Sequence, residues 1–173
     1  MNEQDCKALI AGMGNQIVQD PKEFWGLVQA VQGINPKKIL EIGTDFGGTL
    51  RFWQLIAGQE GQAYGVDDRG INSVDMSGYP APLMLVGDSQ DEEMVGRVRE
   101  HAPFDFLFID ADHSYEGCKR DWENYSPMVR VGGLVGFHDY NHPPVRRVFD
   151  EIQVGTKEYF DITMGIGIVR MPT

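Results

Sequence analysis

The sequence predicts an α/β domain in which helices alternate with the strands of a mostly parallel sheet. The apolar run at 39–42 leads through a glycine-rich turn into a segment with helical spacing, which is typical of a buried strand, a loop and a helix. Two more apolar runs, at 104–109 and 132–137, each end abruptly in polar residues. Such continuous apolar runs are typical of strands that helices cover on both faces.

Length and composition set the outer bounds. The 173 residues fit one domain with a sizeable core. The formal net charge of −11 argues against nucleic acid and against an anionic membrane as partners, because both repel an acidic surface. Cys6 and Cys118 lie far apart in the chain, and no run approaches transmembrane length or resembles a signal-peptide core. We therefore expect a single domain, residues 1–173, in the cytoplasm.

The N-terminal region, residues 1–35, is expected to be a helical cover for a core that spans 36–171. A strong helix is predicted to begin at Asp20, which can cap it, and Pro21 suits the first helical position. Glu23 follows the cap by three residues, as in a capping box. We expect this helix to cover one face of the sheet.

The remaining elements alternate along the chain. Strands are predicted at 63–67, 83–86, 104–109 and 132–137, with a final hairpin at 157–162 and 166–170. Helices are predicted at 50–57, after 90, at 116–130 and at 145–152. The polar segment 69–82 is interpreted as a long loop near the functional site.

Polar side chains gather where these strands end. Asp67 and Asp68 close the strand at 63–67, Asp110-Ala111-Asp112-His113 follow the strand at 104–109, and His138-Asp139 follow the strand at 132–137. Because the carboxyl ends of parallel strands form the binding crevice of such a sheet, these side chains are expected to face one cleft together with the glycine loop.

The glycine loop carries the first family resemblance. Its pattern E-x-G-x-x-x-G-G, from Glu41 to Gly48, lacks the spacing of dinucleotide binders and resembles the first motif of class I S-adenosylmethionine-dependent methyltransferases. The resemblance implies that the acid and the loop hold the methionine part of the cofactor. The candidate cofactor residues in this motif are Glu41, Gly43, Thr44, Gly47, Gly48 and Thr49.

Other acids are candidates for the nucleoside part of the cofactor. An acid at the end of the second strand is placed to accept hydrogen bonds from ribose hydroxyls, and the resemblance gives Asp67 this task. Asp68, Asp110 and Asp112 are further candidates for cofactor contacts. In the methyltransferase interpretation, Asp88 would accept from the exocyclic amine of adenine and Ser89 would line the same edge. Gly-Asp-Ser before a helix is also a plain N-cap, so this alternative stays open.

The two later strand ends narrow the resemblance. F-I-D-A-D-H-S-Y-E and G-G-L-V-G-F-H-D resemble the branch with cephalosporin-hydroxylase-like, sugar, and catechol or caffeoyl-CoA O-methyltransferases. By position, Asp110, His138 and Asp139 match the residues that hold a divalent metal in those relatives. His138 departs from their usual carboxylate. Imidazole with carboxylates suits a transition metal better than magnesium alone, so the metal's identity stays open.

The resemblance also implies a fold and a mechanism. The fold is a three-layer Rossmann-like sheet of seven strands in the order 3-2-1-4-5-7-6, with the last strand antiparallel. His113 occupies the position of the catalytic lysine of the catechol enzymes, and its ordinary pKa suits a general base at neutral pH. We therefore predict an S-adenosylmethionine-dependent O-methyltransferase with His113 and Asp110 as catalytic residues and a small-molecule hydroxyl as acceptor.

Three other interpretations remain open. A metal-independent methyltransferase would use a histidine alone as base. A non-catalytic cofactor-binding domain is possible because fold does not fix function. A nicotinamide-dependent dehydrogenase would share Asp67, but the glycine spacing disfavours this interpretation. Asp110 and Asp139 would also have no evident role in such an enzyme. A homo-oligomer is compatible with the short chain, which could borrow a partner subunit to wall its site.

Overall fold

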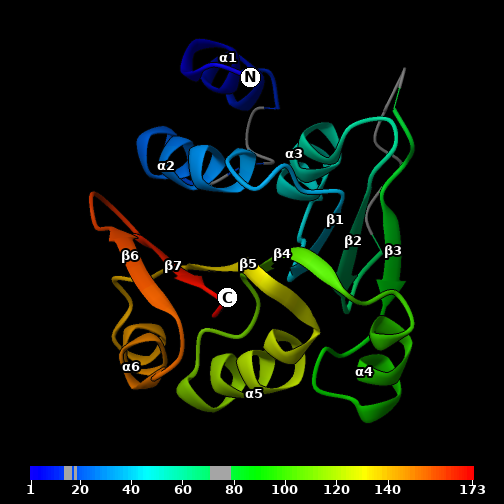
Figure 1. Ribbon diagram of the computed structural model, residues 1–173, viewed down its shortest axis with the longest axis vertical. Coiled ribbons are helices and arrows are strands. Elements are labelled where there is room, and N and C mark those ends of the chain that lie inside the picture. The colour runs from blue at the N-terminus through cyan, green and yellow to red at the C-terminus, as the bar shows by residue number, and fades with distance from the viewer. Residues whose placement is uncertain (14–16, 18, 71–78) are drawn as a thin grey trace.

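One seven-stranded sheet forms the centre of the protein (Figure 1). The computed structural model describes residues 1–13, 17, 19–70 and 79–173. The strand order is β3-β2-β1-β4-β5-β7-β6; neighbours from β3 to β5 are parallel, whereas β7 is antiparallel to both β5 and β6. The strands are β1 (Lys38–Ile42), β2 (Gln62–Asp67), β3 (Leu83–Val86), β4 (Phe104–Ile109), β5 (Val129–His138), β6 (Thr156–Phe160) and β7 (Ile166–Arg170). The predicted strand order and the antiparallel last strand are confirmed.

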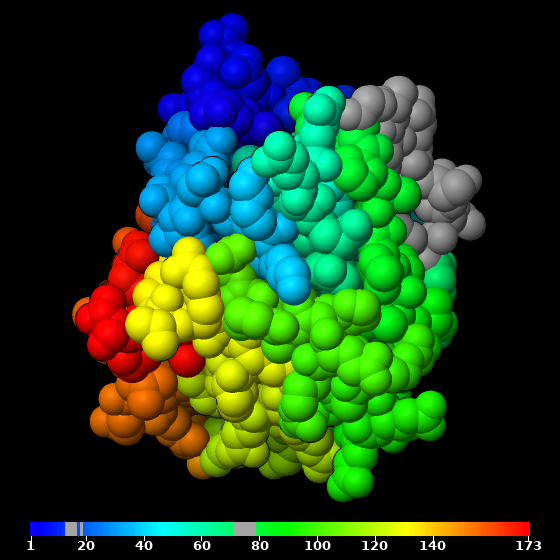
Figure 2. Space-filling view, turned by 45° about the vertical axis from the view of Figure 1, so that its right-hand side comes forward, coloured from blue at the N-terminus to red at the C-terminus, as the bar shows by residue number. Residues whose placement is uncertain are grey.

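Helices cover both faces of this sheet (Figure 1). One face carries α1 (Glu3–Met13), α2 (Pro21–Gln32) and α3 (Gly48–Ala57), and the other carries α4 (Glu92–Arg99), α5 (Tyr115–Tyr125) and α6 (Pro143–Glu151). Figure 2 shows α1 as the outermost layer, above α2. None of these helices is long and apolar enough to cross a membrane. Within the expected loop at 69–82, residues 71–78 lie outside the described part of the chain.

Strand β4 divides the core between the two faces. Phe104 and Leu107 belong to the cluster beneath α4, α5 and α6, whereas Phe106 and Phe108 belong to the cluster beneath α2 and α3. The Trp53 ring of α3 lies 5.0 Å from the Phe106 ring and 5.7 Å from the Phe108 ring, measured between centroids. These edge-on aromatic contacts fix α3, and therefore the glycine loop that precedes it, against β4.

One predicted helix ends early. The spacing predicts a helix over 116–130, but α5 ends at Tyr125 and a 3-10 turn, Ser126–Met128, connects it to β5. Pro127 lies within that turn, and a proline lacks the backbone N–H that an α-helix needs and disfavours helical geometry at the preceding residue. Strand β5 consequently begins at Val129 rather than at residue 132.

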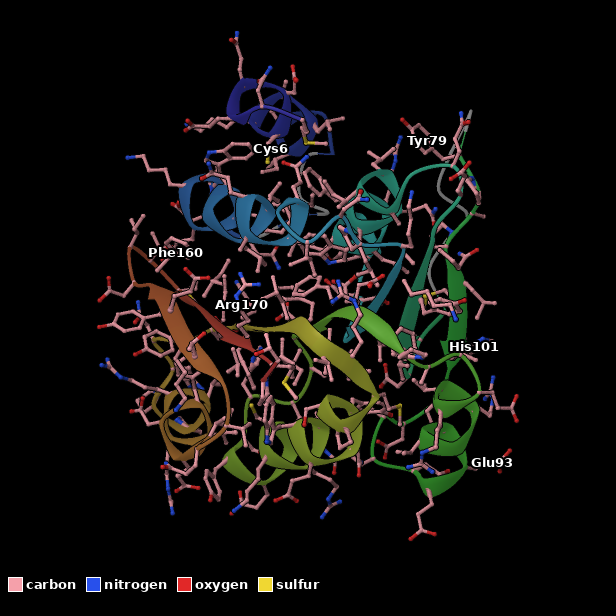
Figure 3. All side chains as sticks on the ribbon, in the orientation of Figure 1. Cys6, Tyr79, Glu93, His101, Phe160 and Arg170 are labelled. Carbon is pink, nitrogen blue, oxygen red and sulfur yellow. The ribbon has the colours of Figure 1, made fainter. Side chains whose placement is uncertain are left out.

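The N-terminal cover is attached through α2. Asp20 caps this helix, accepting hydrogen bonds from the backbone N–H of Lys22 at 2.8 Å and of Glu23 at 3.3 Å, and Pro21 begins it, as predicted. Cys6 lies fully buried between α1 and α2 (Figure 3). At the other side of α2, the Phe160 ring from the end of β6 packs so closely on Gly26 that a Cβ there would collide with it (Figure 3).

The capping-box role predicted for Glu23 is wrong. Its fully buried carboxylate faces the β6–β7 loop, where it accepts hydrogen bonds from the backbone N–H of Thr163 at 2.6 Å, the Thr163 hydroxyl at 2.9 Å and the Gly165 N–H at 3.2 Å. Three hydrogen-bond donors of the loop stabilise a buried carboxylate more than the single backbone N–H at the helix start would. Glu23 therefore connects α2 to the loop between the last two strands.

We expect Glu23→Ala to lower the free energy of unfolding by about 2–3 kcal/mol, because it leaves buried donors of the β6–β7 loop without an acceptor. Urea denaturation followed by circular dichroism measures this change. Lys22→Ala is the matched control, since the Lys22 side chain is exposed on the same helical turn, and we expect it to change stability by less than about 0.5 kcal/mol. Equal denaturation midpoints for the two variants would contradict the proposed anchoring role.

Candidate active site

Two cavities open at the carboxyl edge of the parallel strands. The first has a volume of about 540 Å³, and we name it the nucleoside cavity after the ligand that the sequence predicts for its residues. The second, the acid–histidine cavity, has a volume of about 460 Å³. Gly43, Asp45 and Asp110 line both cavities. The nucleoside cavity is otherwise lined by Val66, Asp67, Asp68, Arg69, Gly87, Asp88, Ser89, Gln90, Ala111 and Asp112, and the acid–histidine cavity by Gln19, Thr44, Thr49, His113, His138, Asp139 and Met164.

The boundary between the cavities depends on a close backbone approach. Gly43 has a φ of +83°, and a Cβ at this position would collide with the Asp110 carbonyl. The Gly43 N–H donates to the Val66 carbonyl at 2.8 Å, and the Asp110 N–H donates to the Ile42 carbonyl at 2.8 Å. Only glycine combines this left-handed conformation with this contact at low cost. The ends of β1 and β4 therefore lie side by side without an intervening side chain.

The Asp67 carboxylate fixes the backbone of the glycine loop through hydrogen bonds. One carboxylate oxygen accepts from the N–H groups of Thr44 and Asp45, both at 2.9 Å, and the other accepts from the Arg69 N–H at 2.9 Å. Burial raises the pKa of Asp67, but these backbone hydrogen bonds outweigh it, so the pKa lies below its ordinary value. Asp67 is thus an ionised acceptor in the wall of the nucleoside cavity. The adjacent Asp68 is mostly exposed beside the Arg69 guanidinium.

Glu41 lies beneath the loop rather than in a cavity wall. Its side chain is fully buried and accepts a hydrogen bond from the Thr49 hydroxyl, while its second oxygen has no partner among the described residues. Burial raises the pKa of Glu41 well above its ordinary value.

The two last glycines of the motif lie at the start of α3. Gly47, with a φ of +78°, precedes this helix, which begins at Gly48. Neither glycine lines the nucleoside cavity or the acid–histidine cavity, whereas Thr49 lines the latter.

The far wall of the nucleoside cavity is built from the β3–α4 turn. Asp88 accepts from the Gln90 N–H at 2.8 Å, but α4 is capped by Asp91, which accepts from the Glu93 N–H at 3.1 Å. The alternative of Asp88 as N-cap is therefore wrong, and its carboxylate remains in the cavity wall. The Ser89 hydroxyl donates to Asp121 at 2.8 Å.

The start of α5 contributes the last acid of this wall. Asp112 accepts from the Ser114 N–H at 2.8 Å, and Ser114 caps α5 by accepting from the Gly117 N–H at 3.0 Å. The turn therefore keeps the Asp112 carboxylate beside the nucleoside cavity, where Asp110 also lies.

The acid–histidine cluster consists of Asp110, His113, His138 and Asp139, whose ligand atoms all lie within 4.8 Å of one another. His138 Nδ1 lies 3.0 Å from Asp110 Oδ1 and 3.2 Å from Asp139 Oδ2, and His113 Nε2 lies 3.0 Å from the same Asp139 oxygen. Asp139 adopts a φ of +55°. The structure therefore brings together the three predicted metal ligands and the predicted base.

Charge compensation within this cluster shifts the pKa values of its members. Burial lowers the pKa of His138, but hydrogen bonds to Asp110 and Asp139 outweigh it and raise this pKa to about 10. The hydrogen bond to Asp110 likewise raises the pKa of His113, although partial burial opposes it. Burial raises the pKa of Asp139, but His138 lowers it more strongly, to below its ordinary value. The two imidazoles therefore act as counterions for the carboxylates.

Several residues at these cavities were not predicted as site residues. Gln19 donates from Nε2 to Asp110 Oδ2 at 2.9 Å, although 91 positions separate the two residues. Met164 lines the acid–histidine cavity from the β6–β7 loop. No local pattern marks either residue. Asp45 and Arg69 could have been found, because Asp45 lies inside the glycine motif and Arg69 directly follows the acids that end β2.

Comparisons with known proteins match the chain to methyltransferases. A family model described as a methyltransferase domain matches residues 40–140. The rhamnosyl O-methyltransferase of Mycobacterium leprae is 22% identical over 145 residues, which cover 78% of this chain and 63% of the relative. The caffeoyl-CoA O-methyltransferase of Populus kitakamiensis is 27% identical over 119 residues, which cover 60% of this chain and 47% of the relative. The chain thus spans less than two thirds of the length of these relatives.

A solved structure also resembles the fold. The MycE methyltransferase from the mycinamycin biosynthetic pathway, in complex with Mg and SAH, has a TM-score of 0.64 and 21% sequence identity, covering 85% of this chain and 48% of its own. The resemblance to sugar and caffeoyl-CoA O-methyltransferases that the strand-end motifs predict is confirmed. The match to the family model covers more than half of the chain, so the protein belongs to the methyltransferase domain family.

Proposed function

We propose that the protein transfers a methyl group from S-adenosylmethionine to a hydroxyl of a small molecule, with a divalent metal at the acceptor side. The observation that carries this proposal is the pair of cavities that meet at Gly43 and Asp110. One is walled by acceptors suited to a nucleoside, and the other holds a cluster suited to a cation. Methyl transfer needs such adjacency, because the acceptor must lie in line with the activated methyl group.

The nucleoside cavity fits the cofactor by the chemistry of its wall. The ionised carboxylate of Asp67 can accept hydrogen bonds from ribose hydroxyls. At the β3–α4 turn, Asp88 and Ser89 offer oxygen atoms to a purine edge. Gly43 and Asp110 line both cavities, so the methionine part would lie at the boundary between them. SAH occupies the related MycE structure, which supports this assignment.

The acid–histidine cluster fits a divalent cation. Asp110, His138 and Asp139 would hold it, and two carboxylates with an imidazole suit Mn²⁺ or a related transition metal better than Mg²⁺. Two buried polar atoms here, Asp139 Oδ1 and His138 Nε2, have no hydrogen-bond partner among the described residues. A bound metal would supply Lewis acidity that stabilises an acceptor alkoxide or phenolate.

His113 is the proposed general base. Its side chain is 42% exposed, at the mouth of the acid–histidine cavity, so it can reach an acceptor hydroxyl. A base must be neutral, and the nearby carboxylates raise its pKa. The same carboxylates would be partly neutralised in the metal-loaded protein, where the pKa of His113 should fall toward its ordinary value. Asp139, whose Oδ2 lies 3.0 Å from His113 Nε2, would then stabilise the positive charge that develops on the ring.

A metal-independent methyltransferase is the second candidate. It is favoured by the His138–Asp110 pair, whose 3.0 Å contact already satisfies both charges without a cation. In that mechanism a histidine alone would remove the proton. A cofactor-binding domain without activity is the third candidate, and cofactor affinity without turnover would distinguish it.

We further propose that residues 1–173 act as one domain in the cytoplasm and that neither nucleic acid nor a membrane is a partner.

We expect Asp67→Asn to weaken S-adenosylhomocysteine binding by about 10- to 100-fold, because the variant loses a charge-assisted acceptor for ribose and loosens the loop at Thr44 and Asp45. Isothermal titration calorimetry measures the affinity. Asp161→Asn is the control, since that carboxylate is exposed and lines neither cavity, and it should change affinity by less than about twofold. Equal affinities for the two variants would remove Asp67 from the cofactor site.

Metal binding should release protons and strengthen as pH rises. His138 has a raised pKa of about 10 and must lose its proton to become a ligand, so the apparent affinity for Mn²⁺ should rise by up to about tenfold per pH unit between pH 6.5 and 9. Calorimetry in buffers of different ionisation enthalpy counts the protons. Asp139→Ala should abolish uptake, whereas Asp112→Ala should preserve it, and uptake by Asp139→Ala would contradict the ligand set.

We expect His113→Ala to lower kcat by about 10²- to 10⁴-fold on an acceptor identified by screening sugars and phenols for S-adenosylhomocysteine release. The control is His142→Ala, whose ring lies 6.3 Å from that of His113 but outside the acid–histidine cluster. Cofactor affinity should stay unchanged in both variants. A His113→Ala protein with wild-type turnover would show that another group takes the proton.

A further inference from the structure

A buried acid behind the nucleoside cavity has no task in the mechanism above. Asp121 lies on α5, and its side chain has no exposed surface. One carboxylate oxygen, Oδ1, accepts a hydrogen bond from the Ser89 hydroxyl at 2.8 Å. The other, Oδ2, is buried without a hydrogen-bond partner among the described residues. This half-satisfied carboxylate needs an explanation, because native proteins rarely leave buried polar atoms unpaired.

The surroundings of Asp121 disfavour a charge. The pKa of Asp121 is raised to about 7, chiefly by burial and further by the nearby Asp112 and Asp88. The hydrogen bond from Ser89 and the charge of Arg120 act in the opposite direction. A buried acid beside two other acids costs stability that an apolar residue of similar size would not. Packing therefore does not account for an aspartate at this position.

Helix α5 holds Ser89 at two points. Besides the contact through Asp121, the Tyr125 hydroxyl donates to the Ser89 carbonyl at 2.6 Å from the next turn of the helix. Tyr125 fixes the main chain, and Asp121 fixes the side chain. Ser89 also lines the nucleoside cavity, so its orientation decides what the cavity wall offers to a ligand.

The hydrogen bond to Asp121 limits what the Ser89 hydroxyl can offer to a ligand. A serine hydroxyl carries one proton and two lone pairs. Once that proton is directed to Asp121, only lone pairs remain for any other partner of the Ser89 oxygen. A ligand atom that meets this oxygen must therefore be a hydrogen-bond donor.

We propose that Asp121 is a positioning residue that makes the Ser89 hydroxyl an acceptor toward the nucleoside cavity, which thereby selects a purine with an exocyclic amine over one with an oxo group. This inference rests on the proposed function, which places the purine of the cofactor at this wall. Asp121 touches Ser89 and not the cofactor, so it acts on specificity through a neighbour.

Calorimetric titrations of S-adenosylhomocysteine and S-inosylhomocysteine at pH 8, above the Asp121 pKa of about 7, test the inference. The two ligands differ in the amine and the oxo group of the purine. We expect Asp121→Leu and Ser89→Ala each to reduce the wild-type preference for the adenosyl ligand by about five- to tenfold. In the Ser89→Ala background, Asp121→Leu should reduce the preference no further, because the two residues act as one unit.

Tyr125→Phe is the matched control on the same helix. It removes the hydroxyl that holds the Ser89 carbonyl and leaves the side-chain contact in place, so it should weaken both ligands equally without changing their ratio. The Tm of Asp121→Leu should equal or exceed that of the wild type. A purely structural role for Asp121 predicts the opposite, a lower Tm with an unchanged ratio.

Each outcome decides a separate question. Binding of both ligands to a folded Asp121→Leu protein with the wild-type ratio would overturn the role of Asp121. A wild-type ratio in Ser89→Ala would overturn it as well, and this test does not depend on Asp121→Leu folding. A folded wild-type protein that binds neither ligand would instead contradict the proposed function, and this inference with it.

Discussion

The site depends on the contact between the backbones of Gly43 and Asp110. These residues directly follow the neighbouring parallel strands β1 and β4, and a Cβ on Gly43 would collide with the Asp110 carbonyl. Because no side chain separates the strand ends, the nucleoside cavity and the acid–histidine cavity share one boundary. The aromatic contacts of Trp53 with Phe106 and Phe108 hold α3 and its preceding loop in register with β4. Core packing thus helps to fix the relative position of the two cavities.

The second feature of the structure is the way in which its clustered carboxylates are stabilised. The protein carries a net charge of −11 and still concentrates acids at one sheet edge. Backbone N–H groups stabilise Asp67, and imidazoles stabilise Asp110 and Asp139. Where such partners are few, as at Glu41 and Asp121, burial raises the pKa instead. The acids therefore differ in their chemistry. Asp67 is an ionised acceptor in the wall of the nucleoside cavity, whereas the acid–histidine cluster pairs carboxylates with imidazoles.

Periodicity and strand ends predicted an alternating α/β domain with a mostly parallel sheet, and the family resemblance supplied the order of the strands. Apolar runs located the strands, and the parallel topology placed Asp67, Asp110 and Asp139 at one edge before any contact was known. Contacts between distant residues carried no local signal. Glu23 bonds to a loop 142 positions away, which overrode the capping box, and Gln19 reaches Asp110 from 91 positions away. The Ser89–Asp121 pair likewise follows only from how α5 packs against the β3–α4 turn.

A crystal structure grown with S-adenosylhomocysteine and Mn²⁺, with anomalous difference density for the metal, tests the central claim most directly. The account predicts the adenosyl group against Asp67 and Ser89, the sulfur at the boundary formed by Gly43 and Asp110, and a manganese peak among Asp110, His138 and Asp139. Ligand density outside the nucleoside cavity would contradict the account. So would a manganese peak away from the acid–histidine cluster, because the two cavities would then not form one site for methyl transfer.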